Sequence, residues 1–308
     1  MEGKKILVLL SSFNGEKYIE QQIRSIMGQQ GVQVDLKVRD DGSKDGTCAI
    51  VKKLSAEYPD RIQLIHGENL GLNASFFELI NTAPEGYDYY SISDQDDVWL
   101  PDKLLIAVKA LEKEKRDSHE PLLFASTSYL AEDDLKPYGQ TRRQNRPFTI
   151  YNTVIQNICP GHTQVMNPEL LKLVQRNWDT DRIYVYDSWI MNMAQLYGKI
   201  VFSNTSMTLY RQHRDNQLGS GSGSVGQLME SGKRISNSHG MRYRRQVAYF
   251  LEMNEQKLSE MGFAEELRKF LQAESFIDRF KYSLHGRLYR QKKIETLAFY
   301  AAVIAGKF

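Results

Sequence analysis

The sequence has few cysteines, no long apolar run and no excess of charge of one sign. Two cysteines in 308 residues cannot make a disulfide framework or a four-ligand zinc site, and we expect both to be buried thiols in a reducing compartment. The apolar runs near the two ends, of five and about ten residues, are too short for a signal peptide or a membrane span. We therefore expect a cytoplasmic protein.

Charge is balanced overall but unevenly distributed along the chain. Forty Lys and Arg stand against 38 Asp and Glu, which argues against a general nucleic-acid binder. Residues 225–308 carry 15 basic and nine acidic residues, a net charge of +6, so residues 1–224 carry a net charge of −4. An acidic front and a basic tail need separate explanations.

The first third of the chain alternates apolar strand patterns with helical ones. Strands are expected at 5–11, 34–38, 62–65 and 87–93, and Asn14 is the expected cap of the first helix. Such alternation predicts an α/β fold with a mostly parallel, Rossmann-like central sheet and helices on both faces.

The middle of the chain is mixed and its end is helical. Strands are expected at 122–130, 163–167, 199–204 and 207–210, with a helix starting near Asp187. The Gly/Ser-rich segment 219–226 is either a domain linker or a mobile active-site flap. We predict a first domain at 1–218, this loop at 219–226, and a helical basic region at 227–308.

Three polar clusters follow the ends of predicted strands. They are Ser12–Asn14, Asp40–Ser43 and Asp94–Asp97. Ligands of open α/β sheets bind outside the carboxyl ends of the strands, so we expect the three loops to converge on one crevice.

The Asp94–Asp97 cluster predicts a metal site. One of its carboxylates could simply form a turn or cap a helix, but a turn does not explain three carboxylates in four positions. Crowded carboxylates repel one another, and bound Mg²⁺ or Mn²⁺ would relieve that repulsion while leaving positions for diphosphate oxygens.

The loop at 40–47 could be an ordinary strand–turn–helix connection. Paired with the acidic cluster, however, it suits a nucleotide, because one loop offers acceptors for base and ribose while the other holds a metal for the phosphates. A Walker-type motif is absent from the sequence, and no Gly-x-Gly-x-x-Gly directly follows a predicted strand, which argues against P-loop and dinucleotide-binding folds.

Taken together, these motifs resemble the family 2 glycosyltransferases of the GT-A fold over about residues 4–215. Within that family, Asp-Gln-Asp-Asp-Val-Trp resembles bacterial rhamnosyltransferases of cell-wall and O-antigen polysaccharide synthesis. The segments that carry the resemblance are Ser11–Gly15 with Tyr18-Ile19, Arg39–Ser43, Asn69–Gly71 and Ser93–Trp99.

The resemblance implies roles for individual residues. Asp96 with Asp94 would hold the metal, and Asp187 would be the catalytic base, although Asp187 could also be only a helix N-cap. The segment 210–213 resembles one that contacts the diphosphate or metal, and His213 could also be a solvated loop histidine. The implied nucleotide-sugar contacts are Ser11, Phe13, Asn14, Asp40, Asp41, Asp94 and Arg211; the implied metal ligands are Asp96, Asp94 and His213; acceptor-side candidates are Asp97, Gly161, His162 and Trp189.

These roles imply an inverting transfer of a sugar, with L-rhamnose from dTDP-L-rhamnose preferred, to a growing lipid-linked cell-surface polysaccharide. A UDP-galactose or UDP-glucose donor is the alternative. A metal-dependent phosphohydrolase and a non-catalytic glycan-binding module are more distant alternatives. The phosphohydrolase would need a nucleophilic Asp near the first strand, where Ser11, Ser12 and Asn14 stand.

The basic tail remains open to three interpretations. Residues 279–293 hold six Lys and Arg and no acid, and the apolar run 297–304 follows. The segment could be a solvated helix face, a self-association helix forming a homo-oligomer, or a surface that docks at 279–305 on the anionic inner face of the cell membrane. Binding of nucleic acid is not expected, because the catalytic half is acidic.

Overall fold

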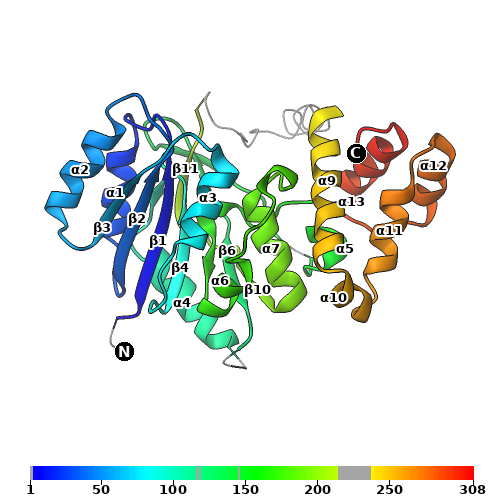
Figure 1. The fold of residues 1–308 in the computed structure, drawn as a ribbon, viewed down its shortest axis with the longest axis horizontal. Helices are drawn as coiled ribbons and strands as arrows, with labels where there is room; N and C mark the ends of the chain where they lie inside the picture. The colour runs from blue at the N-terminus through cyan, green and yellow to red at the C-terminus, as the bar shows by residue number, and fades with distance from the viewer. Residues whose placement is uncertain (1–2, 116, 118, 145, 214–236) are drawn as a thin grey trace. The chain divides into compact units, whose positions relative to one another are not determined.

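The computed structural model describes residues 3–115, 117, 119–144, 146–213 and 237–308 (Figure 1). The predicted Gly/Ser loop at 219–226 lies outside the described residues. The described chain forms two compact units. A sheet unit contains residues 3–143, 159–178 and 197–213, and a helical unit contains residues 144–158, 179–196 and 237–308.

The sheet unit is built on a seven-stranded sheet in the order β10-β6-β9-β4-β1-β2-β3. All neighbours pair in parallel except β9, which is antiparallel to both β4 and β6. This confirms the predicted α/β class with a mostly parallel sheet. The strands are β1 (Lys5–Ser12), β2 (Gln33–Asp40), β3 (Ile62–His66), β4 (Tyr89–Ser93), β6 (Leu122–Ser126), β9 (Val165–Met166) and β10 (Lys199–Ser203).

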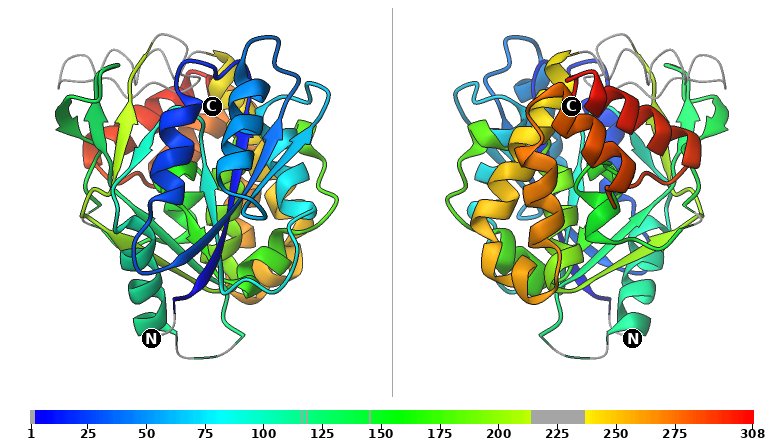
Figure 2. Two further views of the ribbon diagram at one scale, coloured as in Figure 1. Left: turned by 90° about the vertical axis from the view of Figure 1, so that its left-hand side faces the viewer. Right: turned by 90° about the vertical axis from the view of Figure 1, so that its right-hand side faces the viewer.

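Helices cover both faces of this sheet (Figures 1 and 2). Successive side chains of a strand point to opposite faces. Ile6, Val8 and Leu10 of β1 therefore join one core with α1, α2 and α4, while α3 and α6 lie on the other face. These helices are α1 (Ile19–Met27), α2 (Thr47–Glu57), α3 (Leu72–Asn81), α4 (Lys103–Glu114) and α6 (Pro168–Val174).

A second, four-stranded sheet in the order β5-β11-β7-β8 belongs to the same unit. It corrects one prediction, because 122–130 is not a single strand. The chain leaves the large sheet after Ser126, and Thr127 and Ser128 make the crossing by donating backbone hydrogen bonds to Ser203 O and Thr141 Oγ1. The strands are β5 (Val98–Trp99), β7 (Tyr129–Ala131), β8 (Pro137–Gln140) and β11 (Thr208–Arg211).

The helical unit is α-helical, apart from connecting loops and one 3₁₀ turn, as the sequence predicts for its C-terminal part. Its core gathers aromatic side chains, and Trp189 stacks on Tyr249 with ring centroids 5.2 Å apart. Its elements are α5 (Ile150–Thr153), the 3₁₀ turn η2 (Thr180–Arg182), α7 (Tyr186–Tyr197), whose last residue falls in the sheet unit, α9 (Asn237–Met253), α10 (Glu255–Glu260), α11 (Ala264–Gln272), α12 (Phe276–His285) and α13 (Lys293–Ile304). Among the described residues, no helix has the length and apolarity needed to cross a bilayer.

Candidate functional site

The three predicted polar loops meet at one edge of the large sheet. Strand register aligns Ser12 with Asp40 and Leu10 with Ser93, so β1, β2 and β4 end together. Gln95 joins two of the loops, since its Oε1 accepts a hydrogen bond from Phe13 N at 2.9 Å and its Nε2 donates to Phe13 O at 3.1 Å. The Phe13 side chain itself stays 43% exposed, free to cover a ligand.

Asn14 joins the first and second loops. Its backbone N donates to Ser43 Oγ at 2.9 Å, and its Oδ1 accepts from Lys44 N at 2.9 Å. The predicted helix-capping role of Asn14 is therefore wrong: its φ of 48° is left-handed, and α1 begins after Tyr18 without a side-chain cap. Asn tolerates this conformation better than most residues, which explains its place in the turn.

Gly15 allows these loops to approach one another. A Cβ at this position would lie 2.2 Å from Gln95 Oε1, closer than two nonbonded atoms can come. A residue with a side chain would therefore push Gln95 away from Phe13.

Asp41 is committed to internal contacts. Its carboxylate pairs with Arg39 and accepts backbone hydrogen bonds from Leu70 at 2.8 Å and Gly71 at 2.9 Å. Arg39 Nη1 also donates to Ser75 Oγ, which lies 2.6 Å from the hydroxyl of Ser11. The predicted nucleotide contacts of Asp41 and Ser11 stay predictions, and their observed partners hold the 69–71 loop and α3 against the strand ends.

Asp96 and His213, two of the predicted metal ligands, lie in direct contact, and their role as metal ligands stays a prediction. The distance from Asp96 Oδ2 to His213 Nε2 is 2.8 Å, and both side chains are largely buried. The imidazole stacks on Tyr18 with ring centroids 4.9 Å apart. Tyr18 is held in turn by Asp133, whose Oδ1 accepts its hydroxyl hydrogen at 2.5 Å.

Arg211 is buried beneath the acidic loop. Its Nε donates to Asp96 O at 2.9 Å and its Nη2 to Gln21 Oε1 at 2.7 Å, while Nη1 donates to Asp133 O. The guanidinium also lies 4.6 Å from the centre of the Tyr18 ring. Arg211 therefore fixes the backbone of the acidic loop, and its expected contact with a diphosphate stays a prediction.

Asp94, Asp97 and His162 form a second group in the same loop region. His162 Nδ1 lies 3.9 Å from Asp94 Oδ2 and 3.8 Å from Asp97 Oδ2, while Nε2 lies 2.8 Å from Ser128 Oγ. Burial, with a smaller effect of Lys103, lowers the pKa of His162 to about 3, so the ring is neutral. Burial, followed by repulsion from Asp96 and Asp94, raises the pKa of Asp97.

Lys103 places a second buried ionisable group near Asp97. Its Nζ lies 3.4 Å from the centre of the Trp99 ring and has no hydrogen-bond partner among the described residues. Burial lowers the pKa of Lys103 to about 7, although the Asp97 charge opposes that shift.

The chemistry of these donors fits a divalent metal. Two adjacent ligands of an octahedral ion lie about 3.0 Å apart when metal–ligand bonds are about 2.1 Å, close to the distance of 2.8 Å between Asp96 Oδ2 and His213 Nε2. The Asp94–Asp97–His162 group, whose ligand atoms lie within 4.8 Å of one another, is a further set of donors.

Asp187 and Trp189 belong to the helical unit. Asp187 lies in the first turn of α7, 7% exposed, and its Oδ1 accepts from Ser188 N at 2.7 Å. Gln246 of α9 orients this turn, since its Oε1 accepts from Tyr184 N and Val185 N. Trp189, an acceptor-side candidate, has no exposed surface and packs in the aromatic core of the unit.

Sequence reasoning missed several residues that build the site. Gln95 stood within a recognised motif, and Tyr18 within another, so both had a local signal. Asp133, Ser128 and Gln246 had none, because each acts on a site residue that is distant in the sequence.

Comparison with known proteins shows the family of the chain. The model of glycosyl transferase family 2 matches residues 7–167, which include the acidic loop. The dTDP-rhamnosyl transferase RfbG of Shigella flexneri is 28% identical over 223 residues, covering 68% of this chain and 73% of RfbG.

Solved structures show the same fold at low sequence identity. A Staphylococcus aureus TarS structure in complex with UDP-GlcNAc has a TM-score of 0.55 at 17% identity, covering 97% of this chain and 81% of that one. The mannosyltransferase PcManGT of Pyrobaculum calidifontis, in complex with GDP-Man and Mn²⁺, has a TM-score of 0.56 at 17% identity, covering 99% and 86%. The predicted GT-A fold is thereby confirmed.

Replacing Gln95 should loosen the first loop without unfolding the protein. Gln95→Met removes both hydrogen bonds to Phe13, each contributing about 1 kcal/mol, so exchange of the loop amides should accelerate about fivefold or more. Hydrogen–deuterium exchange of peptides spanning 12–16 measures this. Gln63→Met on the exposed face of β3 is the control, and unchanged exchange in Gln95→Met would contradict the clamp.

Proposed function

Because the chain belongs to glycosyl transferase family 2, we propose that it transfers L-rhamnose from dTDP-L-rhamnose to a hydroxyl of a growing cell-surface polysaccharide. The observation that carries the activity is the acidic loop after β4, in which Asp96 lies against His213 and Gln95 is hydrogen-bonded to Phe13. The loop of Phe13 is in turn joined to the Asp40–Ser43 loop through Asn14. The similarity to RfbG supports the rhamnosyl donor.

The donor diphosphate would bind at the edge where β1, β2 and β4 end. Asp40 would accept from the base, and the exposed Phe13 ring would stack on it. Asp96 and His213, with Asp94, would hold Mn²⁺ or Mg²⁺, which supplies positive charge to the departing diphosphate when bound. Arg211 keeps this loop in position through Asp96 O.

Asp187 would act as the general base. Its carboxylate would take the proton from the acceptor hydroxyl as that oxygen attacks the anomeric carbon. One base and a single displacement give inversion at that carbon. Gln246 would act as a positioning residue, because it fixes the turn from which Asp187 projects.

Ligand-dependent stabilisation tests the donor and the metal. dTDP-L-rhamnose with Mn²⁺, at about 100 times its Kd, should stabilise the protein by about 2.7 kcal/mol, and the effect should be measurable as a rise in Tm. Asp96→Asn should abolish the Mn²⁺-dependent part of that rise, and Asp134→Asn, at an exposed carboxylate, should not. A larger rise in Tm with UDP-hexoses would identify UDP-galactose or UDP-glucose as the donor. No rise in Tm with any nucleotide sugar would contradict the proposal.

Removing the base should affect turnover and spare donor binding. Asp187→Asn keeps the size of the side chain, so we expect kcat to fall about 10²–10⁴-fold while the Kd for the donor stays within about twofold. Asp181→Asn, at an exposed position of the same unit, is the control. Loss of donor affinity with transfer preserved would overturn the assignment of Asp187.

We also propose that the acceptor is lipid-linked and that the helical unit docks on an anionic membrane. Helices α12 and α13 expose six large apolar side chains, and four basic residues of this segment are exposed as well. The apolar residues are Phe276 (61%), Ile277 (62%), Phe280 (47%), Leu284 (63%), Ile294 (58%) and Leu297 (70%), and the basic ones are Lys281, Arg287, Lys292 and Lys293.

The spacing and charge of this apolar–basic surface support a lipid partner. Phe276, Phe280 and Leu284 recur every four residues, so they lie on one face of α12. A basic residue near an anionic surface contributes about 1 kcal/mol, and burial of a large apolar side chain adds about 1.5–3 kcal/mol.

Vesicle co-sedimentation tests this surface. Phe280→Glu/Leu284→Glu should reduce binding to phosphatidylserine-containing vesicles at least about tenfold, because it removes two inserting groups and adds two negative charges. Met253→Glu/Met261→Glu, which alters exposed methionines elsewhere in the helical unit, is the control. Equal vesicle binding by both variants would contradict docking. Docking would also be contradicted if the wild-type protein does not bind vesicles and instead forms a dimer that Phe280→Glu/Leu284→Glu disrupts.

A further inference from the structure

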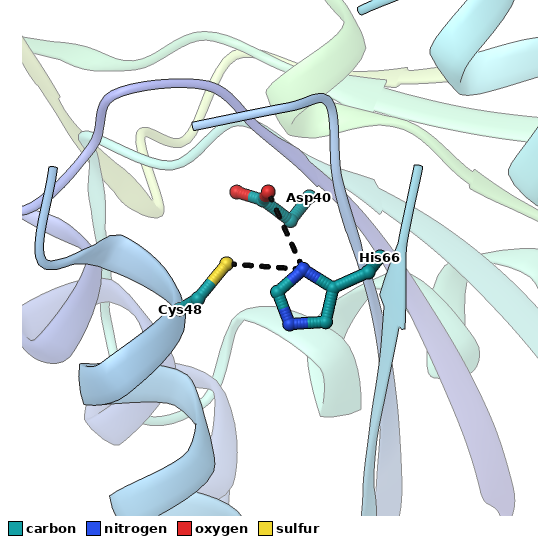
Figure 3. A group of neighbouring side chains, drawn as sticks. All are labelled: Asp40, Cys48 and His66. Carbon is teal, nitrogen blue, oxygen red and sulfur yellow. Dashed lines mark hydrogen bonds and ion pairs between the residues drawn. The ribbon is translucent and has the colours of Figure 1, made fainter. Parts of the chain in front are cut away.

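A second cluster of metal-binding side chains lies at the ends of β2 and β3 (Figure 3). Asp40 is the last residue of β2, His66 is the last residue of β3, and Cys48 lies in the first turn of α2. Strand register pairs Asp40 with His66, and the three side chains point toward one another. They supply a carboxylate, an imidazole and a thiol.

The distances within the cluster match the edges of a small coordination sphere. His66 Nδ1 lies 3.4 Å from Cys48 Sγ and 3.8 Å from Asp40 Oδ2. Around tetrahedral Zn²⁺, bonds of about 2.0–2.3 Å place neighbouring ligands about 3.3–3.8 Å apart. All three ligand atoms lie within 4.8 Å of one another, so movements of a few tenths of an ångström would bring them onto one ion.

Asp40 gives an independent reason to expect a cation. Its side chain is 2% exposed, and its Oδ1 has no hydrogen-bond partner among the described residues. Its Oδ2 accepts from Ser43 N at 3.0 Å. The neighbouring Asp41 is as deeply buried but pairs with Arg39, and no Arg or Lys ion pair is found for Asp40 among the described residues.

The cluster is also accessible. His66 is 52% exposed at its side chain and Cys48 is partly exposed, which leaves room for entry of an ion and for a fourth ligand from solvent. Three protein ligands with one open position is the arrangement of zinc sites that keep an exchangeable ligand. Thiolate and imidazole together select Zn²⁺ over Mg²⁺ or Ca²⁺.

We propose that Asp40, Cys48 and His66 form a second cation site, selective for Zn²⁺ and similar borderline-soft divalent ions. Binding joins the ion to Sγ, Nδ1 and a carboxylate oxygen, and the thiol proton passes to solvent. Where the proposed function holds, Asp40 also contacts the base of the donor, so Zn²⁺ at this site excludes the nucleotide.

Cobalt is the probe for this site, because a thiolate bound to Co²⁺ gives an intense near-ultraviolet charge-transfer band. Titration of the reduced full-length protein with Co²⁺ should produce this band at one equivalent, and Zn²⁺ should then abolish it. Cys48→Ser should lose the band, and His66→Ala should weaken Co²⁺ binding at least about tenfold. Cys159→Ser, which alters the other cysteine, should keep it.

The outcomes separate the site from other binding. No band in the wild type, or a band retained in Cys48→Ser, would overturn the proposal. Circular dichroism verifies the fold of each variant, and protection of wild-type Cys48 from iodoacetamide by Zn²⁺ provides a readout that needs no substitution. Absence of such protection would also overturn the site.

Competition distinguishes this site from the proposed function. Zn²⁺ should raise the apparent Kd for dTDP-L-rhamnose in the wild type but not in Cys48→Ser, with Mn²⁺ constant in both. A thiolate–cobalt band without competition would retain the cation site and contradict the placement of the base at Asp40. Donor binding without a thiolate–cobalt band would contradict the cation site and leave the proposed function in place.

Discussion

The crowding of three carboxylates after β4 is the constraint on which the candidate site depends. Asp97 is fully buried, and its burial together with repulsion from Asp96 and Asp94 raises the pKa of Asp97. Arg211, the last residue of β11, donates to Asp97 Oδ1 from its backbone N and to Asp96 O from its Nε, and His213 lies two residues further on against the Asp96 carboxylate. The small second sheet therefore places Arg211 against the acidic loop.

A division of labour among polar side chains follows from this constraint. Arg39 with Asp41, Gln95 with Phe13, and Arg211 with the Asp96 backbone are fully engaged, and they fix where the loops lie. Asp96 with His213, and Asp40 with its unpartnered oxygen, retain capacity for a cation or a ligand. Some motif residues therefore hold the loops in place, while others can still bind a cation or a ligand. The amino-acid type alone does not tell which residue does which.

The sequence predicts those features whose cause is local. The apolar run of β1 and the aspartates that follow β4 are each recognisable within a few residues of sequence. The α/β class and the acidic edge of the sheet were therefore predictable. Asn14 was misassigned because its partners, Ser43 and Lys44, come from another loop about thirty residues away. The break in the strand at Thr127 was missed because Thr127 and Ser128 are hydrogen-bonded to Ser203 and Thr141, which are distant in the sequence. The contact of Cys48 with His66 could not be predicted without the strand register.

The close approach of Gly15 to Gln95 also restricts how the protein can be re-engineered. A loop grafted from a relative would bring its own residue at either position, and a side chain at 15 would displace the amide end of Gln95 from Phe13. The two segments, eighty residues apart, therefore form one transferable module. Chimaeras that preserve the hydrogen bonds between Gln95 and Phe13 would have to exchange both strand ends together.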